Sequence, residues 1–580
     1  MCWQKYCSIR HCLDGRGANR PKIRTWANQA FELSNLSEVG RQSQDGFTAR
    51  GRSVGLTSDL LSREDSCQPA RHHTFTAMEL LGVDLTLPLT LLAGFLVLVY
   101  IYGKWRFRLL KDAGFPGPEP DIYLGDLRRV MRDGIDLENK LGKKYGDVFG
   151  VWLGGFPMVN VFDVDIIKEV LIKDFKNFTD RLVFELNDFP FSTNLFNSRG
   201  ETWRRLRNII SPTFSGVKLR RMCAGLNTCA GKLTENLAAV AESGEAVVVK
   251  KYFGAFTMDS IASTAFGIDT DSQNGTESGF LKAAKNIFDN NVIGNPILLI
   301  ALVFPGLQPL LAKLGFSTLP RSSKAFFENS VKDIIKQRRE EPEADRRRRG
   351  DFLQLLLNAE NDVTQDGNTD QSHKKMSTDE VIGQAFVFFL AGYETTASTL
   401  QFLAYVLATH PDIQQKLSEE IDSVLGDKDP DYDSIHELVY MDLVVTETLR
   451  LYPIVPDVDR YVSETTTIKG WTFPKGVYIN IPVVQMHRNP DIYPEPLKFK
   501  PERWEKKSEI NPMYYLPFGH GPRQCVGMRL ALVEIKVALA HLLKKLHFVR
   551  LADTPDVLTD FKPFDVLAPK KPIELKVKFR

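Results

Sequence analysis

The sequence is poor in cysteine and has almost no net charge. Its 580 residues include 7 cysteines, which are scattered and form no CxxC pair, so neither a disulfide framework nor a zinc site is indicated. Lys and Arg number 74 against 72 for Asp and Glu, which gives a net charge of +2. We therefore expect no nucleic-acid partner.

Internal repeats and nucleotide-binding motifs are also missing. No repeat of roughly 20 to 50 residues is present, which argues against a solenoid or a propeller. No GxGxxG or Walker pattern lies between a strand and a helix, so the chain has no evident nucleotide site of its own. Its length is nevertheless sufficient for one large domain with a sizeable buried site.

The first segment, residues 1–77, differs from the rest of the chain. It is rich in Arg, Ser, Gly and Asn and has no sustained apolar periodicity. Two interpretations stay open at this stage. The segment is either a low-complexity, disordered extension or, if the natural product starts at Met78, a gene-model artefact.

An uncharged apolar run then occupies residues 85–102. Its length is close to the roughly 20 residues that cross a bilayer, and basic residues follow at once, without the small residues of a cleavage site. We predict a membrane anchor over residues 78–103, with its basic flank in the cytosol. A basic, Pro-rich linker over residues 104–120 and a main domain over residues 121–580 are expected to follow.

Helical patterns dominate the main domain, and short β-type runs lie near Val148–Leu153 and Val477–Pro482. The fold class is therefore mainly α with a smaller β region. The longest predicted helix begins at Ser377, where Glu380 completes a capping box, and ends before His410. Because it is apolar nearly all round, it should cross the interior.

The strongest motif is Phe518-Gly-His-Gly-Pro-Arg-Gln-Cys525-Val-Gly527, which leads directly into an apolar helix. A cysteine just before a helix meets unpaired N–H groups and the positive end of the helix dipole, and both favour a thiolate. Gly521 and Gly527 allow the backbone to approach a flat cofactor, and Arg523 offers a fixed cation to a carboxylate. The alternative, an inert cysteine in a tight turn, does not explain why an aromatic residue, two glycines and an arginine lie at fixed spacings around Cys525.

Phe518, Gly521, Arg523, Cys525 and Gly527 resemble the haem-binding signature of the cytochrome P450 superfamily. The resemblance extends over about residues 114–580. It is nearest to the microsomal family 3, subfamily A type that oxidises drugs and steroids, through stretches such as Phe352-Leu-Gln-Leu-Leu and Met486-His-Arg-Asn-Pro. It implies the cytochrome P450 fold, haem b with Cys525 as the axial ligand of its iron, and monooxygenase activity that uses dioxygen and NADPH-derived electrons.

Two further motifs have a structural role in this family. Glu447-Thr-Leu-Arg450 resembles its Glu-x-x-Arg helix motif, and Pro501-Glu-Arg503-Trp resembles the segment whose arginine completes a triad. Glu447 and Arg450 lie on one helix face amid apolar residues, so their burial requires full pairing.

In the long helix, Ala391-Gly-Tyr-Glu-Thr-Thr396 resembles the oxygen-activation motif of the family. Gly392 leaves room for dioxygen, and Glu394 and Thr395 are the predicted catalytic residues, which would deliver protons. By the same resemblance, the haem carboxylates should meet Trp203, Arg207, Arg460, Arg181 and Arg523. The substrate pocket should lie near residues 183–195 and be lined by Phe386, Phe389, Val455, Pro456 and Phe564.

The resemblance also identifies partners and a location. NADPH–cytochrome P450 reductase should supply electrons, with cytochrome b5 as a further partner, and the substrate should be lipophilic, a steroid, fatty acid or xenobiotic. Basic residues offer one docking surface for an acidic flavoprotein; they are Arg204, Arg205, Lys218, Arg220 and Arg221. The expected location is the endoplasmic reticulum (microsomal) membrane, single-pass, with the domain on the cytosolic face. The apolar run Ile297–Phe304 is either core or a second, shallow membrane contact.

Two other functions remain to be distinguished. A haem-thiolate isomerase or dehydratase of the thromboxane-synthase kind needs neither dioxygen nor a reductase, but such relatives typically lack the acid and alcohol of Glu394 and Thr395. A non-catalytic haem sensor or electron carrier would have little use for that relay or for a large apolar pocket. Turnover with reductase and NADPH, compared with a hydroperoxide alone, separates the three.

Overall fold

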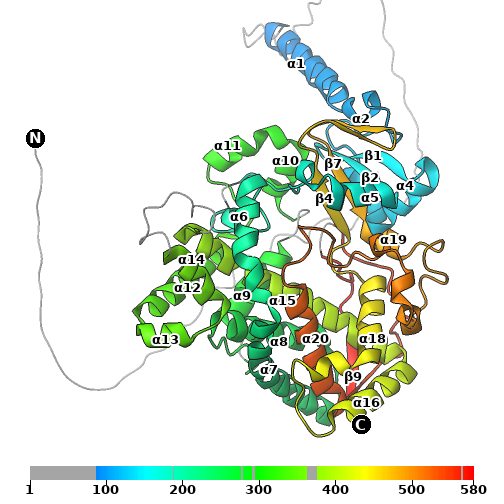
Figure 1. The fold of residues 1–580 in the computed structure, drawn as a ribbon. Helices are drawn as coiled ribbons and strands as arrows, with labels where there is room; N and C mark the ends of the chain where they lie inside the picture. Colours follow the sequence, from blue (N-terminus) through cyan, green and yellow to red (C-terminus); the bar gives the residue numbers. More distant parts are fainter. Residues whose placement is uncertain (1–85, 187, 276–277, 291–293, 362–374, 564–565) are drawn as a thin grey trace, which may run out of the picture. The chain divides into compact units, whose positions relative to one another are not determined.

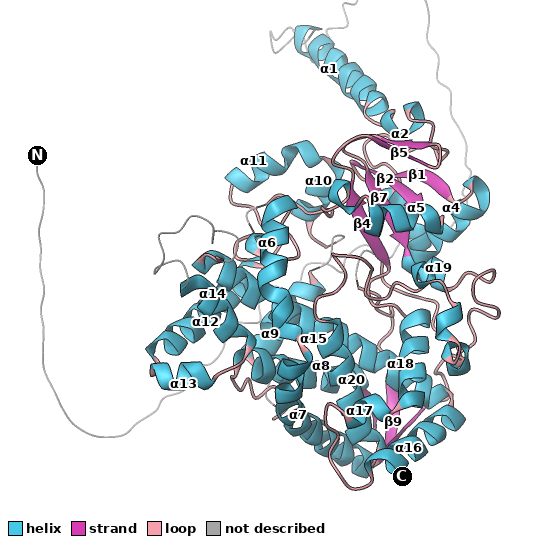
Figure 2. Cartoon of the chain, viewed as in Figure 1, coloured by secondary structure: helices cyan, strands magenta, loops and turns pink. Residues whose placement is uncertain are grey.

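The computed structural model describes residues 86–580 except 187, 276–277, 291–293, 362–374 and 564–565. The predicted extension over residues 1–77 and the predicted pocket residue Phe564 lie outside the described residues. Helices predominate in the described part, with β1, β2, β4 and β7 together at one end of it and β9 near the C-terminus at the other (Figures 1 and 2). The predicted class, mainly α with a smaller β region, is confirmed.

The helices as far as residue 361 are α1 (Thr86–Trp105), α2 (Leu109–Asp112), α3 (Leu127–Asp133), α4 (Leu137–Tyr145), α5 (Val164–Lys168), α6 (Gly200–Ile210), α7 (Gly216–Ser243), α8 (Val249–Ile261), α9 (Gly279–Asp289), α10 (Pro296–Val303), α11 (Gln308–Lys313), α12 (Arg321–Glu340), α13 (Glu343–Arg348) and α14 (Phe352–Asn361). The later helices are α15 (Thr378–Thr409), α16 (Pro411–Leu425), α17 (Ser434–Glu437), α18 (Val439–Leu451), α19 (Val483–His487) and α20 (Met528–Leu543).

The strands are β1 (Val148–Leu153), β2 (Phe156–Val161), β3 (Ala246–Val248), β4 (Asp457–Tyr461), β5 (Thr466–Ile468), β6 (Trp471–Phe473), β7 (Tyr478–Pro482), β8 (Leu546–Val549) and β9 (Glu574–Phe579). The largest sheet has the order β1-β2-β7-β4, with β2 and β7 parallel and its other pairs antiparallel. Arg460 of β4 lies opposite Ile479 of β7, and this register fixes where the guanidinium leaves the sheet.

The long helix α15 organises the interior. Its N-terminus has the predicted capping box, in which Ser377 and Glu380 exchange hydrogen bonds, and it ends at Thr409 before His410-Pro411. Contacts with α8, α18 and α20 surround it with apolar side chains (Figure 1). This arrangement explains why α15 is apolar on nearly every side, as the sequence predicted.

Residues 104–120 are not a free linker. Phe107, Leu110 and Phe115 are buried in one apolar cluster with side chains of the β1-β2-β7-β4 sheet. The amide of Gly150 in β1 also donates to the carbonyl of Pro116 at 2.8 Å. The predicted boundary at residue 120 is therefore wrong, because the apolar side chains between the prolines bind this segment to the domain.

One described helical stretch, Thr86–Asp112, which includes α1 and α2, is long and apolar enough to cross a membrane. It starts within one residue of the predicted apolar run and exposes most of its apolar side chains. A second apolar element is the bent pair formed by Pro296–Val303 and Pro305–Lys313, at 113° to each other. On this pair Leu298 and Leu302 are buried, whereas Leu310 is exposed.

Candidate active site

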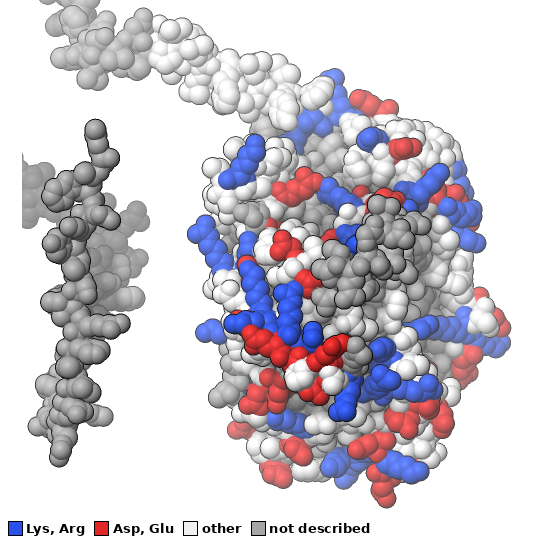
Figure 3. All heavy atoms as spheres, turned by 60° about the vertical axis from the view of Figure 1, so that its left-hand side comes forward, with Lys and Arg blue, Asp and Glu red and all other residues white. Residues whose placement is uncertain are grey.

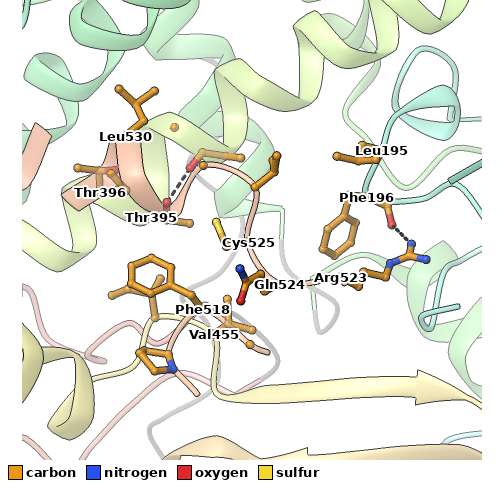
Figure 4. A pocket seen from close by; sticks show the side chains of 18 of the residues that line it. Leu195, Phe196, Thr395, Thr396, Val455, Phe518, Arg523, Gln524, Cys525 and Leu530 are labelled. Atoms are coloured by element: carbon orange, nitrogen blue, oxygen red, sulfur yellow. Dashed lines mark hydrogen bonds between the residues drawn. The ribbon is translucent and has the colours of Figure 1, made fainter. Parts of the chain in front are cut away.

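The loop before α20 presents Cys525 to a cavity. The backbone N–H of Cys525 donates to the carbonyl of Phe518 at 2.9 Å, which closes the loop upon itself. Gly521 has a φ of +77°, and a Cβ there would lie 2.1 Å from the carbonyl oxygen of Leu171, so only glycine fits. The side chain of Cys525 is exposed at the cavity, with its sulfur turned inward (Figure 4).

The cavity has a volume of about 330 Å³ and walls from α15, α20, α6, β4 and the cysteine loop. Its apolar side chains include Leu195, Phe214, Ile261, Val387, Phe388, Val455, Val458 and Leu530. Its charged groups are Arg181, Arg207, Asp457, Asp459, Arg460, Arg523 and Glu534. Such a pocket binds a largely apolar ligand and fixes it with a few polar contacts.

Opposing influences act on the Cys525 thiol. Burial raises its pKa above the ordinary value, while the N–H groups of Gly527 and Met528 and the positive charges of Arg181 and Arg207 lower it. The predicted helix-terminus stabilisation is therefore present, but in the protein without metal it does not overcome burial. A metal ligand must be deprotonated, so binding of iron would release this proton.

Arg460 is the most exceptional cation in the cavity wall. It is 1% exposed, and its Nε and Nη2 have no hydrogen-bond partner in the described part of the chain. Burial, with Arg181 and Arg523 nearby, lowers its pKa to about 9. Because an uncompensated buried cation is costly, this site requires an anion that the protein itself does not supply.

The other predicted cofactor contacts surround the same space. Trp203 and Arg207, one turn apart on α6, both line the cavity, as does Arg181, whose guanidinium covers the ring of Phe196 at 4.9 Å. Arg523 is different, because three backbone carbonyls take its N–H groups at 2.6 to 3.0 Å. It mainly joins the cysteine loop to residues 179–198, with a pKa lowered to about 9 by burial.

These residues fit haem. A thiol faces the cavity, a Cβ at Gly527 would meet no atom within 4 Å, and the unpartnered N–H groups of Arg460 suit a carboxylate. An anionic, flat group with a metal at its centre satisfies all three.

The predicted catalytic residues Thr395 and Glu394 differ in their position relative to the cavity. Thr395 lines the cavity, and its hydroxyl donates to the carbonyl of Ala391 at 2.7 Å (Figure 4). Glu394 is 5% exposed, does not line the cavity, and forms an ion pair with Lys250 of α8. Of the two predicted catalytic residues, Thr395 therefore faces the cavity and Glu394 does not, because consecutive residues on a helix point about 100° apart.

Two aromatic pocket residues were assigned to the wrong face of α15. Phe386 and Phe389 are fully buried against Phe327, and Phe389 also stacks on Phe266 at 4.1 Å. The side chain that lines the cavity is Phe388. On a helix that is apolar all round, the sequence pattern does not identify which face meets the cavity.

Of the two predicted pocket residues just before β4, one lines the cavity and one does not. Val455 lines the cavity as predicted, together with Ile454. Pro456 does not line it, and its carbonyl accepts a hydrogen bond from Val484 at 3.2 Å. Among residues 454–460 Pro456 alone is absent from the cavity wall.

Glu447, Arg450 and Arg503 meet in the interior as the motif spacing suggested. Both carboxylate oxygens of Glu447 accept from Arg450 at 2.8 Å, and Arg503 Nε donates at 3.2 Å. Trp504 Nε1 and the backbone N–H of Lys500 complete the set at 2.9 and 3.0 Å. The buried pair is fully hydrogen-bonded, which is the condition under which it is tolerated.

Several residues of the site were not predicted. Lys250 is the first of two adjacent lysines, and Glu534 lies two residues before Lys536, so only the packing of distant helices makes them relevant. An acid in the middle of a largely apolar helix was the one available signal for Glu534.

Comparison with known proteins identifies relatives over most of the chain. The family model described as cytochrome P450 matches residues 116–577. Cytochrome P450 3A29 of Sus scrofa is 40% identical over 493 residues, which cover 84% of this chain and 95% of the relative. Cytochrome P450 3A28 of Bos taurus and 3A9 of Rattus norvegicus are each 39% identical, over 84% and 83% of this chain and 95% and 94% of those relatives.

Proposed function

This chain belongs to the cytochrome P450 family and is a haem-thiolate monooxygenase, and we propose that it inserts one oxygen atom of dioxygen into a C–H bond of a steroid, fatty acid or xenobiotic. Electrons pass from NADPH through NADPH–cytochrome P450 reductase. One observation supports this function above the others: Cys525, from the loop before α20, and Thr395, from α15, face one largely apolar cavity (Figure 4).

Bound haem supplies the oxygen chemistry, in which electron donation from the thiolate favours O–O cleavage. Cys525 would bind its iron. Arg460, Arg207, Trp203 and Arg181 would hold the haem carboxylates, and Arg460 would gain the partners that it otherwise lacks. Phe518 and Gly527 shape the cavity beside the cysteine.

The remaining polar groups manage protons. The Thr395 hydroxyl can rotate from the Ala391 carbonyl and donate to a ligand in the cavity. Glu394 reaches the same space only when its side chain leaves Lys250, so we propose that it recharges the Thr395 hydroxyl through water rather than by direct contact. An isomerase would have no need of this arrangement.

The substrate pocket above Cys525 is apolar. Val387 and Phe388 on α15 and Ile454 and Val455 before β4 line it, which suits a lipophilic substrate held largely by shape and apolar burial. Thr399 and Gln524 are the neutral polar groups that could orient it.

The membrane topology is part of the proposal. We place α1 across the endoplasmic reticulum membrane as a single span, with the domain on the cytosolic face, and α10 and α11 in shallow contact with the same bilayer. Arg106, which follows α1, connects that helix to the end of α10, so both can meet the same bilayer. Its Nη2 donates to the carbonyl of Val303 at 2.6 Å, and its guanidinium covers Phe304 at 5.5 Å.

Electron-transfer partners must meet a surface of mixed charge. Arg204, Arg205 and Arg220 already form ion pairs, with Glu201, Glu380 and Asp433 respectively. On the face drawn in Figure 3, basic and acidic side chains are interspersed rather than separated. We therefore assign the docking of reductase and of cytochrome b5 to a few basic residues. Lys218 and Arg221 should contribute more to this docking than the three arginines that already form ion pairs.

A turnover screen tests the function. The membrane-bound protein is incubated with lipids and xenobiotics, either with reductase, NADPH and dioxygen or with a hydroperoxide alone. Oxygenated product that needs NADPH and takes its oxygen from labelled dioxygen supports the proposal. Isomerised product from the hydroperoxide alone would contradict it.

A further inference from the structure

Glu534 is an acid in the cavity wall for which the proposed reaction has no role. It lies on α20, nine residues after Cys525, and is 4% exposed. Thr396 of α15 and Ile261 of α8 line the cavity with it. The acid therefore lies at the edge of the space that haem would fill, on the helix that follows the iron ligand.

Its carboxyl group is incompletely satisfied. Oε1 of Glu534 is buried and has no hydrogen-bond partner in the described part of the chain. Burial raises the pKa of Glu534 to about 8, and the hydroxyls of Ser260 and Thr396 offset part of this effect. A carboxyl that is buried without a cation is more stable in its neutral form.

The groups around Glu534 do not provide that cation. On α7, burial raises the pKa of the Cys229 thiol to about 12, so it stays neutral. On α8, Asp259 is an acid that accepts hydrogen bonds from residues 270–273. On α20 itself, Lys536 binds Asp442 at 2.6 Å instead. Within the described residues, Glu534 has no ion-pair partner.

We propose that Glu534, through the charge on its own carboxyl group in the cavity wall, sets the reduction potential of the haem. The inference depends on the proposed function in one respect, which is that haem binds in this cavity. An anion near the iron stabilises the ferric state, which carries one more positive charge than the ferrous state. In the pH range where Glu534 is anionic beside ferric haem and neutral beside ferrous haem, reduction by one electron therefore brings up to one proton from solvent onto Glu534.

The sign of the effect follows from these charges. Below pH 7 the carboxyl is protonated, so wild type and Glu534→Gln should have the same reduction potential. As the pH rises through about 8, Glu534 ionises and the wild-type potential falls. The glutamine variant keeps a neutral side chain of the same size, so its potential lacks this fall.

The test is a potentiometric titration of the holoenzyme at intervals from about pH 6.5 to pH 9.5. Asp126→Asn is the matched control, because burial also raises the pKa of Asp126 but neither its side chain nor that of the neighbouring acid Asp121 lines the cavity. We expect the wild-type and Asp126→Asn curves to run together and the Glu534→Gln curve to depart upward above pH 8. Three parallel curves would overturn the inference.

Two further measurements make the outcome unambiguous. Infrared difference spectra between pH 7 and pH 9 should show the loss of a protonated carboxyl band that Glu534→Gln lacks from the start, and its persistence at pH 9 would overturn the inference. If Glu534→Gln binds no haem, Glu534→Met serves the same comparison. If wild type shows a normal ferrous–CO band and the redox curves are parallel, this inference alone is wrong. If wild type lacks the ferrous–CO band, the proposed function is contradicted too.

Discussion

Lys250 of α8 and Glu394 of α15 form an ion pair that holds the acid away from the cavity, one residue before the threonine that faces it. The pair makes a buried carboxylate tolerable. Glu394 therefore has a structural role as well as the proposed role in proton supply.

Loss of the lysine should destabilise the protein. Lys250→Met leaves Glu394 buried without its cation, and we expect the free energy of unfolding at pH 7 to fall by about 1 to 3 kcal/mol. Chemical denaturation followed by tryptophan fluorescence measures this. Lys251→Met is the matched control, since that side chain is exposed and next in sequence. An equal change in both variants would contradict the role of the pair.

Loss of the threonine hydroxyl should uncouple the reaction. Thr395→Ala removes a hydroxyl that binds no metal, so folding, haem content and substrate binding should stay near those of wild type. NADPH consumption should continue while product per NADPH falls and hydrogen peroxide is released. General acid–base groups contribute about 10²- to 10⁴-fold, and replacement by water makes the lower end our expectation. Thr409→Ala, at the end of the same helix and outside the cavity wall, should retain coupling, and unchanged coupling in Thr395→Ala would refute the relay.

The unpartnered arginine should distinguish haem binding from folding. Arg460→Met removes a buried cation without a full set of partners, so the haem-free protein should be as stable as wild type or more so. Haem should nevertheless be lost roughly 10-fold faster or more to an acceptor protein. Arg204→Met is the control, because that side chain is half exposed and pairs with Glu201. Equal haem loss in both would argue against a carboxylate partner for Arg460.

The sequence itself carries a reporter of topology. Asn274-Gly-Thr is a glycosylation sequon, and Asn274 is exposed. If the domain faces the cytosol, Asn274 should carry no glycan, so wild type and Asn274→Gln made in eukaryotic cells should respond alike to glycosidase digestion. A mass shift that disappears in Asn274→Gln would place the domain in the lumen and reverse the proposed orientation.

Residues at fixed spacing in a motif were the most predictable part of the site. The loop of Phe518 to Gly527 was located because its chemistry is local, and Arg460 because a strand places it at a constant offset from Arg450. Strand β1 at Val148–Leu153 and the ends of α15 were also located exactly or nearly so, since turn and capping residues mark them.

Features that depend on the packing of distant segments were not predictable. Phe388 could not be separated from Phe386 and Phe389, because a helix surrounded by apolar neighbours has no polar face to orient it. The burial of Phe107 depends on a sheet that forms from strands far along the chain. The pairing of Glu394 with Lys250 likewise needs the contact of α8 with α15, which no local pattern reveals.

The central claim is that the Cys525 sulfur is the ligand of haem iron, and the spectrum of the ferrous–CO complex tests it most directly. Wild type should show the long-wavelength band that is peculiar to thiolate-ligated haem. Cys525→His should bind haem with an imidazole ligand and lose that band, while Cys229→Ala, a buried thiol on α7, should keep it. Persistence of the band in Cys525→His would contradict the account.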